Sequence, residues 1–121
     1  MASVTSLRLC GELHPSAAVC GTPREAALRT IAGFEGLDRG RYAGPVGWIG
    51  TDGGGEWAIA LRCGQIAADD PHRMTLYAGC GIVMRSNPAH ELAETDAKLG
   101  PMRQALGAPA PGGVNRGGGE P

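Results

Sequence analysis

Apolar residues recur at helical spacing in the segment that begins at Thr22 and ends near Glu35. Thr22, Pro23 and Glu25 suit the N-cap, the first helical position and the acidic residue of a capping box. We therefore predict a first helix over this segment. Its apolar stripe would consist of Ala27, Leu28, Ile31 and Phe34.

A second helix is predicted near the end of the chain, over residues 89–106. Asn87 and Pro88 precede it as an N-cap and a residue that favours the first helical turn. Gly100 and Pro101 lie inside this helix, and proline removes a helical hydrogen bond. We expect a kink or a brief break at these two residues.

Three strands are predicted between the two helices. The run GPVGWIG (44–50) and the run EWAIALRC (56–63) flank TDGGG, which suits a tight turn, so they should form a hairpin. A third strand is predicted over about 73–83. The resulting fold class is α/β in the broad sense, more narrowly α+β: antiparallel strands with two flanking helices.

The composition fits one domain and argues against two classes of partner. A net charge of -1 and a pI near 6.3 give no electrostatic reason to expect nucleic acid or an anionic membrane surface. No apolar run approaches the ~20 residues of a membrane span, and the first residues lack the apolar region of a secretory signal. We expect a cytoplasmic protein that binds neither nucleic acid nor membrane.

The four cysteines are widely separated, with neither a C-x-x-C pair nor paired histidines beside them. This pattern indicates neither a zinc site nor a disulfide framework. We expect reduced, partly buried side chains at Cys10, Cys20, Cys63 and Cys80.

Glycine and proline dominate the last segment of the chain, residues 107–121. Such a segment has almost no apolar surface to bury, so it cannot offset the entropy lost on folding. We predict that it is disordered.

Three ionisable residues share one face of the second predicted helix. Glu91, Glu94 and Lys98 are spaced by three and four residues, and a helix turns by ~100° per residue. One interpretation is a solvated face with a weak Glu94 to Lys98 pair, worth ~0.2–0.5 kcal/mol. The other is a carboxylate pair that holds a hard cation, with the lysine beside it.

The predicted strands contribute two further candidate features. Strand alternation places Arg62 on one face with Ala58 and Ala60, which leave space around it. Such an arginine is either an edge charge that pairs with a nearby acid or a guanidinium that grips a carboxylate. Alternation also places Gly79 and Gly81 on one face, where their backbone is bare; a β-bulge explains them equally well. Together with the acid pair, these features suggest a small dicarboxylate held partly through Mg²⁺ or Mn²⁺.

Five motifs carry a resemblance to a known family. LHPSAAVCGTPR, GRYAGPVGW, GEWAIALRC, LYAGCGIV and ELAETDAKL follow one another in the order and spacing of chorismate-utilising enzymes. The chain resembles the C-terminal part of that family over about residues 13–106, while residues 1–12 are unmatched. The resemblance implies part of a large α/β fold that is built from both halves of a longer chain.

The resemblance also implies roles for the residues on the last helix. Glu94 matches a direct Mg²⁺ ligand, and Glu91 matches a ligand that acts directly or through water. Lys98 matches the lysine that helps to hold the anionic end of the site. On this basis the shared face is a metal face and not a solvated one.

The remaining site residues follow from the other motifs. Arg62 and Tyr42 match the pair that grips the enolpyruvyl carboxylate of the substrate. Gly79 and Gly81 match the backbone that lines the pocket.

The segment LHPSAAVCG indicates the branch of the family. It resembles the corresponding segment of isochorismate synthases, with Ser16 and Ala17 as departures from a Thr-Pro pair. Relatives that make anthranilate, aminodeoxychorismate or salicylate tend to carry threonine where this chain has Ala18, and His14 also fits the isochorismate-forming group. The resemblance implies Mg²⁺-dependent conversion of chorismate to isochorismate, for menaquinone or siderophore biosynthesis.

The chain departs from the family in one respect. The lysine that activates water, the glutamate that protonates the leaving hydroxyl and another Mg²⁺ ligand are expected before the LHP segment, and MASVTSLRLCGE reproduces none of them. Two hypotheses stay open: a portion of an isochorismate synthase that needs a missing N-terminal half as its partner, or a non-catalytic remnant of this or another branch.

Overall fold

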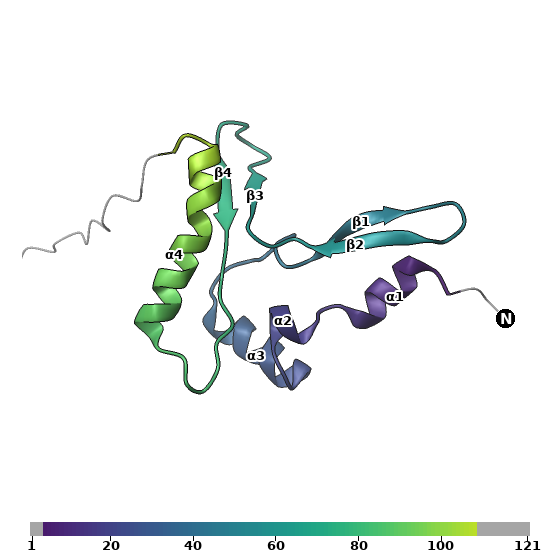
Figure 1. Cartoon of the computed structure of the whole chain (residues 1–121), viewed down its shortest axis with the longest axis horizontal. Helices are drawn as coiled ribbons and strands as arrows, with labels where there is room; N and C mark the ends of the chain where they lie inside the picture. Colours follow the sequence, from purple (N-terminus) through teal and green to yellow (C-terminus); the bar gives the residue numbers. More distant parts are fainter. Residues whose placement is uncertain (1–3, 109–121) are drawn as a thin grey trace, which may run out of the picture.

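The computed structural model of the protein describes residues 4–108. The elements along the chain are α1 (Ser6–Leu13), α2 (Ala17–Cys20), α3 (Arg24–Phe34), β1 (Pro45–Ile49), β2 (Gly55–Ile59), β3 (Cys63–Ile66), β4 (Met74–Tyr77) and α4 (Pro88–Ala105). Helix α4 lies beside one small sheet, and the helices α1 to α3 lie along one side of the molecule, with α1 under the other sheet (Figure 1). The predicted mixture of helices and antiparallel strands is therefore confirmed. The tail predicted to be disordered lies outside the described residues from residue 109 onward.

The predicted hairpin is present as the first of two antiparallel pairs, β1–β2 and β3–β4. In the first pair Gly47 faces Trp57, and a Cβ atom at Gly47 would lie only 2.0 Å from the carbonyl oxygen of Glu56. Glycine is therefore required at this position. The turn is closed by Asp52, whose Oδ1 accepts a hydrogen bond from the Gly54 amide at 3.0 Å.

The prediction of a single strand over 56–63 is wrong, because the chain passes from one sheet to the other within this range. β2 ends at Ile59, β3 begins at Cys63, and Arg62 between them has a positive φ of 48°. Arg62 therefore does not share a strand face with Ala58 and Ala60. The third predicted strand is also shorter than expected, since β4 ends at Tyr77 and residues 78–87 form no regular element.

The two predicted helices are present with changes at their ends. α3 begins one residue late: Pro23 is extended and serves as the N-cap, without a side-chain capping bond. For α4 the predicted cap is confirmed, because Asn87 Oδ1 accepts from the amides of Ala89 and His90. The expected break is wrong, since α4 continues through Pro101 to Ala105.

We attribute the continuity of α4 to its tertiary contacts. Proline at position 101 removes one helical hydrogen bond. The helix nevertheless lies beside β4, and Lys98 donates from α4 to the carbonyl oxygen of Gly79 at 2.9 Å (Figure 1). Packing of this kind commonly outweighs local propensity.

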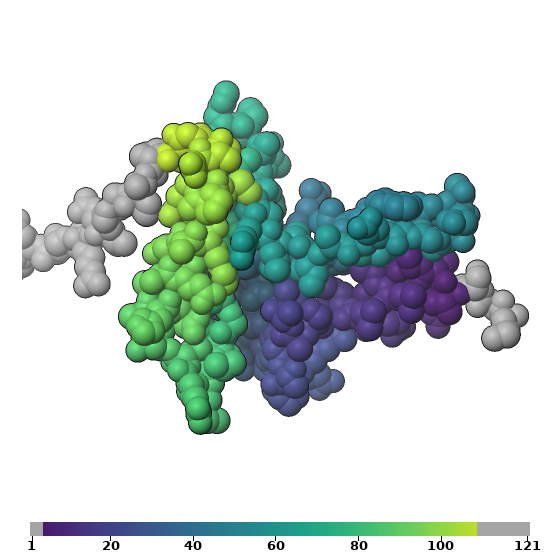
Figure 2. All heavy atoms as spheres, viewed as in Figure 1, coloured from purple at the N-terminus to yellow at the C-terminus, as the bar shows by residue number. Residues whose placement is uncertain are grey.

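Two short helices were not predicted. Thr5 caps α1, because its hydroxyl accepts from the Arg8 amide at 3.3 Å. The amide of Ser6 donates to the carbonyl oxygen of Gly53 at 2.9 Å, which ties α1 to the hairpin turn. The hairpin and α1 together form an arm that projects from the rest of the molecule (Figure 2).

Very little of the described chain is buried. Within residues 4–108 only Cys20 and Ala43 are buried, each with 6% exposure. The other three cysteines are partly buried, and all four carry free thiols. On the predicted stripe of α3, Phe34 is 89% exposed. None of the helices in this range is long and apolar enough to cross a lipid bilayer.

This exposure leads to the first prediction. Because the sheets and helices present uncovered apolar side chains, we expect the isolated chain to self-associate or to unfold with a free energy below the ~5 kcal/mol lower end for stable domains. Light scattering and thermal unfolding monitored by circular dichroism measure both properties. A sharp, reversible transition in a confirmed monomer would contradict the expectation.

Candidate functional site

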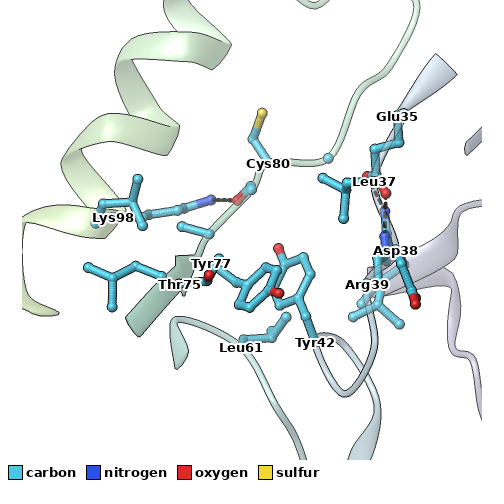
Figure 3. Close-up of a pocket in the computed structure, with 17 residues that line it drawn as sticks. Glu35, Leu37, Asp38, Arg39, Tyr42, Leu61, Thr75, Tyr77, Cys80 and Lys98 are labelled. Atoms are coloured by element: carbon cyan, nitrogen blue, oxygen red, sulfur yellow. Dashed lines mark hydrogen bonds and ion pairs between the residues drawn. The ribbon is translucent and has the colours of Figure 1, made fainter. Parts of the chain in front are cut away.

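A pocket of about 480 Å³ lies where α2, the loop after α3, β4 and α4 meet (Figure 3). It brings together residues from all five of the sequence motifs, although its lining runs from Ala18 to Leu99 along the chain. The predicted site residues among its lining are Ala18, Tyr42, Gly79, Gly81 and Lys98.

Two tyrosines form one wall of this pocket. The rings of Tyr42 and Tyr77 stack with their centroids 5.2 Å apart and an interplanar angle of 16°. Burial raises the pKa of the Tyr42 phenol above its ordinary value. The hydroxyl therefore stays protonated at neutral pH and is able to donate a hydrogen bond.

Gly79 is required by the position of Tyr42. A Cβ atom at residue 79 would lie 2.9 Å from the Tyr42 hydroxyl oxygen, whereas one at Gly81 would have no atom of the described chain within 4 Å. Both glycines lie after β4, so their place in the pocket does not come from strand alternation as predicted. The close approach at Gly79 comes instead from the loop that α4 holds against Tyr42.

This difference between the two glycines gives the second prediction. Gly79→Ala is expected to lower the free energy of unfolding by about 1 kcal/mol, because the Tyr42 ring is held by its stack and must move. Gly81→Ala is the matched control and should stay within about 0.5 kcal/mol of the wild type. Thermal unfolding of the two variants provides the comparison. Equal midpoints would show that the Tyr42 hydroxyl does not occupy this position.

Lys98 contributes a cation to the pocket next to Gly79, the residue that the Tyr42 hydroxyl also approaches. Its ammonium donates to the carbonyl oxygen of Gly79 at 2.9 Å and pairs with Glu94 Oε1 at 2.5 Å. The Lys98 side chain is only 25% exposed, whereas that of Glu94 is 53% exposed. The i,i+4 pair of the solvated interpretation is thus formed, but its cation lies at the pocket and not in open solvent.

Glu91 lies on the neighbouring side of α4, beside a second hollow of about 380 Å³. Hydrogen bonds from the Ser86 and Cys80 side chains lower the pKa of the Glu91 carboxyl. It is therefore ionised at neutral pH. Within residues 4–108 no group of three histidine, cysteine or acidic side chains is arranged to hold a metal ion.

Four predicted residues do not line the pocket: Glu91 and Glu94 on α4, and also His14 and Arg62. His14 caps the C-terminus of α1, where its amide donates to the Cys10 carbonyl at 3.0 Å and its own carbonyl accepts from Arg24. Arg62 lies exposed in the connection between β2 and β3. The predicted Arg62 and Tyr42 pair is therefore not assembled here, because the change of sheets directs the backbone of Arg62 elsewhere.

The structure adds an ion pair that sequence reasoning missed. Arg39 donates through Nε and Nη2 to the two carboxylate oxygens of Glu35, at 2.6 and 2.5 Å. This hydrogen bonding raises the pKa of the arginine. Both residues line the pocket, and their i,i+4 spacing at the end of the first predicted helix was the signal available in the sequence.

The pocket can therefore hold an anion if one of its cations is released from its carboxylate partner. Lys98 and Arg39 each already have a carboxylate partner, so an incoming anion competes with Glu94 or Glu35. A cation bound by Glu94 would remove the competition at Lys98. The hydroxyl of Tyr42 is a neutral donor that needs no such release.

Comparison with known proteins identifies the family. The family model described as "Chorismate binding enzyme" matches residues 1–107. A salicylate biosynthesis isochorismate synthase of Pseudomonas aeruginosa is 51% identical over 102 residues, which cover 84% of this chain and 21% of the relative. A vibriobactin-specific isochorismate synthase of Vibrio cholerae is 44% identical over 104 residues, which cover 86% of this chain and 26% of the relative.

A solved structure agrees with these relatives. The crystal structure of a Bacillus anthracis protein assigned as a 2,3-dihydroxybenzoate-specific isochorismate synthase superposes with a TM-score of 0.81 at 44% identity. The match covers 87% of this chain and 27% of that structure. The chain thus spans about a quarter of the length of the proteins that it matches. It belongs to the chorismate-binding enzyme family, as its motifs predicted.

Proposed function

We propose that this chain is the C-terminal, chorismate-binding portion of an Mg²⁺-dependent isochorismate synthase of the cytoplasm. The observation that carries the proposal is the pocket, which gathers Ala18, Tyr42, Gly79, Gly81 and Lys98 in a chain 51% identical to an isochorismate synthase. The names of the relatives leave two pathways open, since some belong to siderophore biosynthesis and others to the menaquinone branch.

Chorismate is a dicarboxylate, so the proposed site needs donors for two anionic groups. The Tyr42 hydroxyl would donate to one carboxylate, because the neutral phenol is exposed to the pocket. Lys98 would contribute its charge to the second anionic group from its place beside Gly79, whose carbonyl oxygen lies 2.9 Å from the ammonium. Arg62 lies outside the pocket in this structure, so its role in gripping the substrate stays a prediction.

The carboxylates available in this chain would fill only some of the coordination positions of a bound Mg²⁺. Mg²⁺ commonly binds through one or two carboxylates and fills its remaining positions with water and substrate oxygens. Glu94 and Glu91 would supply the carboxylates, and both lie on α4. When bound, Mg²⁺ would neutralise negative charge near the reacting ring. Glu94 would then release Lys98, whose ammonium would become free to bind the anionic end of the substrate.

The reaction also needs proton transfer that this chain does not supply. Water adds at one ring position while the hydroxyl leaves from another, which requires a general base and a general acid. Lys98 is the single lysine of the sequence, and its ammonium already donates to Glu94 and Gly79. Because its contacts engage it with Glu94 and Gly79, we assign this lysine to substrate binding and not to the role of base. Both groups would come from the rest of the domain.

A chimera tests the proposal directly. The segment of this chain that aligns with the Pseudomonas aeruginosa relative would replace its counterpart in that enzyme. Purified chimera and parent enzyme are then compared for isochorismate formed from chorismate with Mg²⁺ present. We expect a rate within about tenfold of the parent, because the grafted segment is proposed to supply substrate and Mg²⁺ binding while the base and the acid stay in the parent.

The alternative is a non-catalytic remnant of the family, in this or another branch. The observation that favours it is the sparse burial, since only Cys20 and Ala43 are buried in the described range. A chimera that folds and melts like the parent but forms no isochorismate would support this alternative against the proposal. Formation of salicylate or anthranilate instead would indicate another branch.

A further inference from the structure

The Glu35 and Arg39 pair has no role in the proposed chemistry, although it adjoins the pocket (Figure 3). Besides its two bonds to Glu35, the guanidinium donates through Nη1 to the carbonyl oxygen of Val19 at 3.1 Å. The side chains of Arg39 and Glu35 are only 26% and 32% exposed. Three bonds in one plane leave this guanidinium little freedom to rotate.

The fixed guanidinium faces one aromatic ring. Its Cζ atom lies 5.7 Å from the centroid of the Tyr42 ring, within the range of a cation–π contact. In Figure 3 the Tyr42 ring lies between Arg39 and the stacked ring of Tyr77. The backbone adds a further link, because the Tyr42 amide donates to the Arg39 carbonyl at 2.8 Å.

We propose that Arg39 is a positioning residue: clamped by Glu35, it fixes the Tyr42 ring so that its hydroxyl stays against Gly79 at the pocket wall. Arg39 acts through Tyr42 and does not bind the ligand itself. The effect on chorismate binding rests on the function proposed above, whereas the positioning of the ring does not.

The competing explanation is an ordinary i,i+4 pair, which contributes about 0.3–0.5 kcal/mol and positions nothing. The chain contains a matched example, since Arg73 Nη2 pairs with both carboxylate oxygens of Asp69 at 2.7 and 2.9 Å. That pair is far more exposed, at 59% and 76%. In the described part of the chain, Arg39 provides the only guanidinium placed over an aromatic ring.

The test uses the two tyrosines of the full chain, Tyr42 and Tyr77, as reporters. After labelling with 3-fluorotyrosine, ¹⁹F NMR gives one resonance for each, and Tyr→Phe variants assign them. Arg39→Lys keeps the charge but loses the planar set of N–H donors. The chemical shift of Tyr42 should therefore lose about half or more of its displacement from that of free fluorotyrosine. Arg73→Lys makes the same change in the exposed pair and should leave both resonances in place.

Several outcomes would overturn the proposal. Unmoved resonances in Arg39→Lys would do so, and so would a wild-type chain whose two resonances both coincide with free fluorotyrosine. If circular dichroism shows that Arg39→Lys loses its helices, Glu35→Gln replaces it in the comparison, and unmoved resonances there overturn the proposal equally. The chimera separates the two proposals: if it folds but forms no isochorismate while Arg39→Lys still displaces the Tyr42 resonance of the chain, the proposed function is contradicted and the positioning role stands.

Discussion

Glu94→Gln in the chimera is expected to lower isochorismate formation by about 100-fold or more, because a hard cation loses an anionic oxygen while the side-chain volume is kept. The remaining rate should require a much higher Mg²⁺ concentration. The measurement is the initial rate as a function of Mg²⁺ for the variant and the unmodified chimera. Lys98→Met should instead act mainly on the KM for chorismate, because the lysine is proposed to bind the substrate.

A matched control distinguishes this result from the loss of a surface pair. Glu25 and Arg29 form an exposed i,i+4 pair on α3, 4.0 Å apart. Glu25→Gln should leave the rate and the Mg²⁺ dependence unchanged, since such pairs contribute only ~0.2–0.5 kcal/mol. Wild-type kinetics in both Glu94→Gln and Lys98→Met would refute the metal face and leave the solvated interpretation.

The 121-residue chain on its own is expected to form no isochorismate. Its single lysine is engaged by Glu94 and Gly79, and the acid and base that the family resemblance implies lie in a segment that this sequence does not match. Without both groups the proton-transfer contribution, typically 10²–10⁴-fold for each, is lost.

Chromatography of chorismate incubated with the chain and Mg²⁺ provides the measurement. Buffer with Mg²⁺ alone is the control for spontaneous decay of the substrate. Turnover near that of the Pseudomonas aeruginosa relative would show that the chain contains a complete catalytic set. Restoration of turnover by an added N-terminal portion of that relative would identify what the chain lacks.

Local chemistry was sufficient to predict several elements of the fold. Asn87 could be predicted as the N-cap of α4, because its side chain accepts hydrogen bonds from amides that any helix leaves free. The hairpin could be predicted from the turn residues between two apolar runs. The position of Arg62 between two sheets could not be predicted from local chemistry. Whether a chain continues a strand or crosses to another sheet depends on contacts with distant residues, such as the bond from the Ala60 amide to the Gly44 carbonyl at 2.8 Å.

In the candidate site, too, some residues can be assigned from the sequence and others only from the structure. Ala18, Tyr42 and Lys98 were assigned from motifs, and the structure brings them to one pocket, although their binding roles stay predictions. The i,i+4 spacing of Glu35 and Arg39 predicts at most an ordinary ion pair, and the sequence does not show that Arg39 has an aromatic neighbour. The ring of Tyr42 supplies that context only in three dimensions.

The solitary lysine has a practical consequence for chemical labelling. Apart from the amino terminus, Lys98 is the only primary amine in the chain, and its side chain is 25% exposed at the wall of the pocket. Any acylating or reductively alkylating reagent that reacts with a side-chain amine must therefore modify this one position. Mass spectrometry of the peptide that contains Lys98 separates this modification from that of the amino terminus and measures the accessibility of the pocket without site-directed substitution.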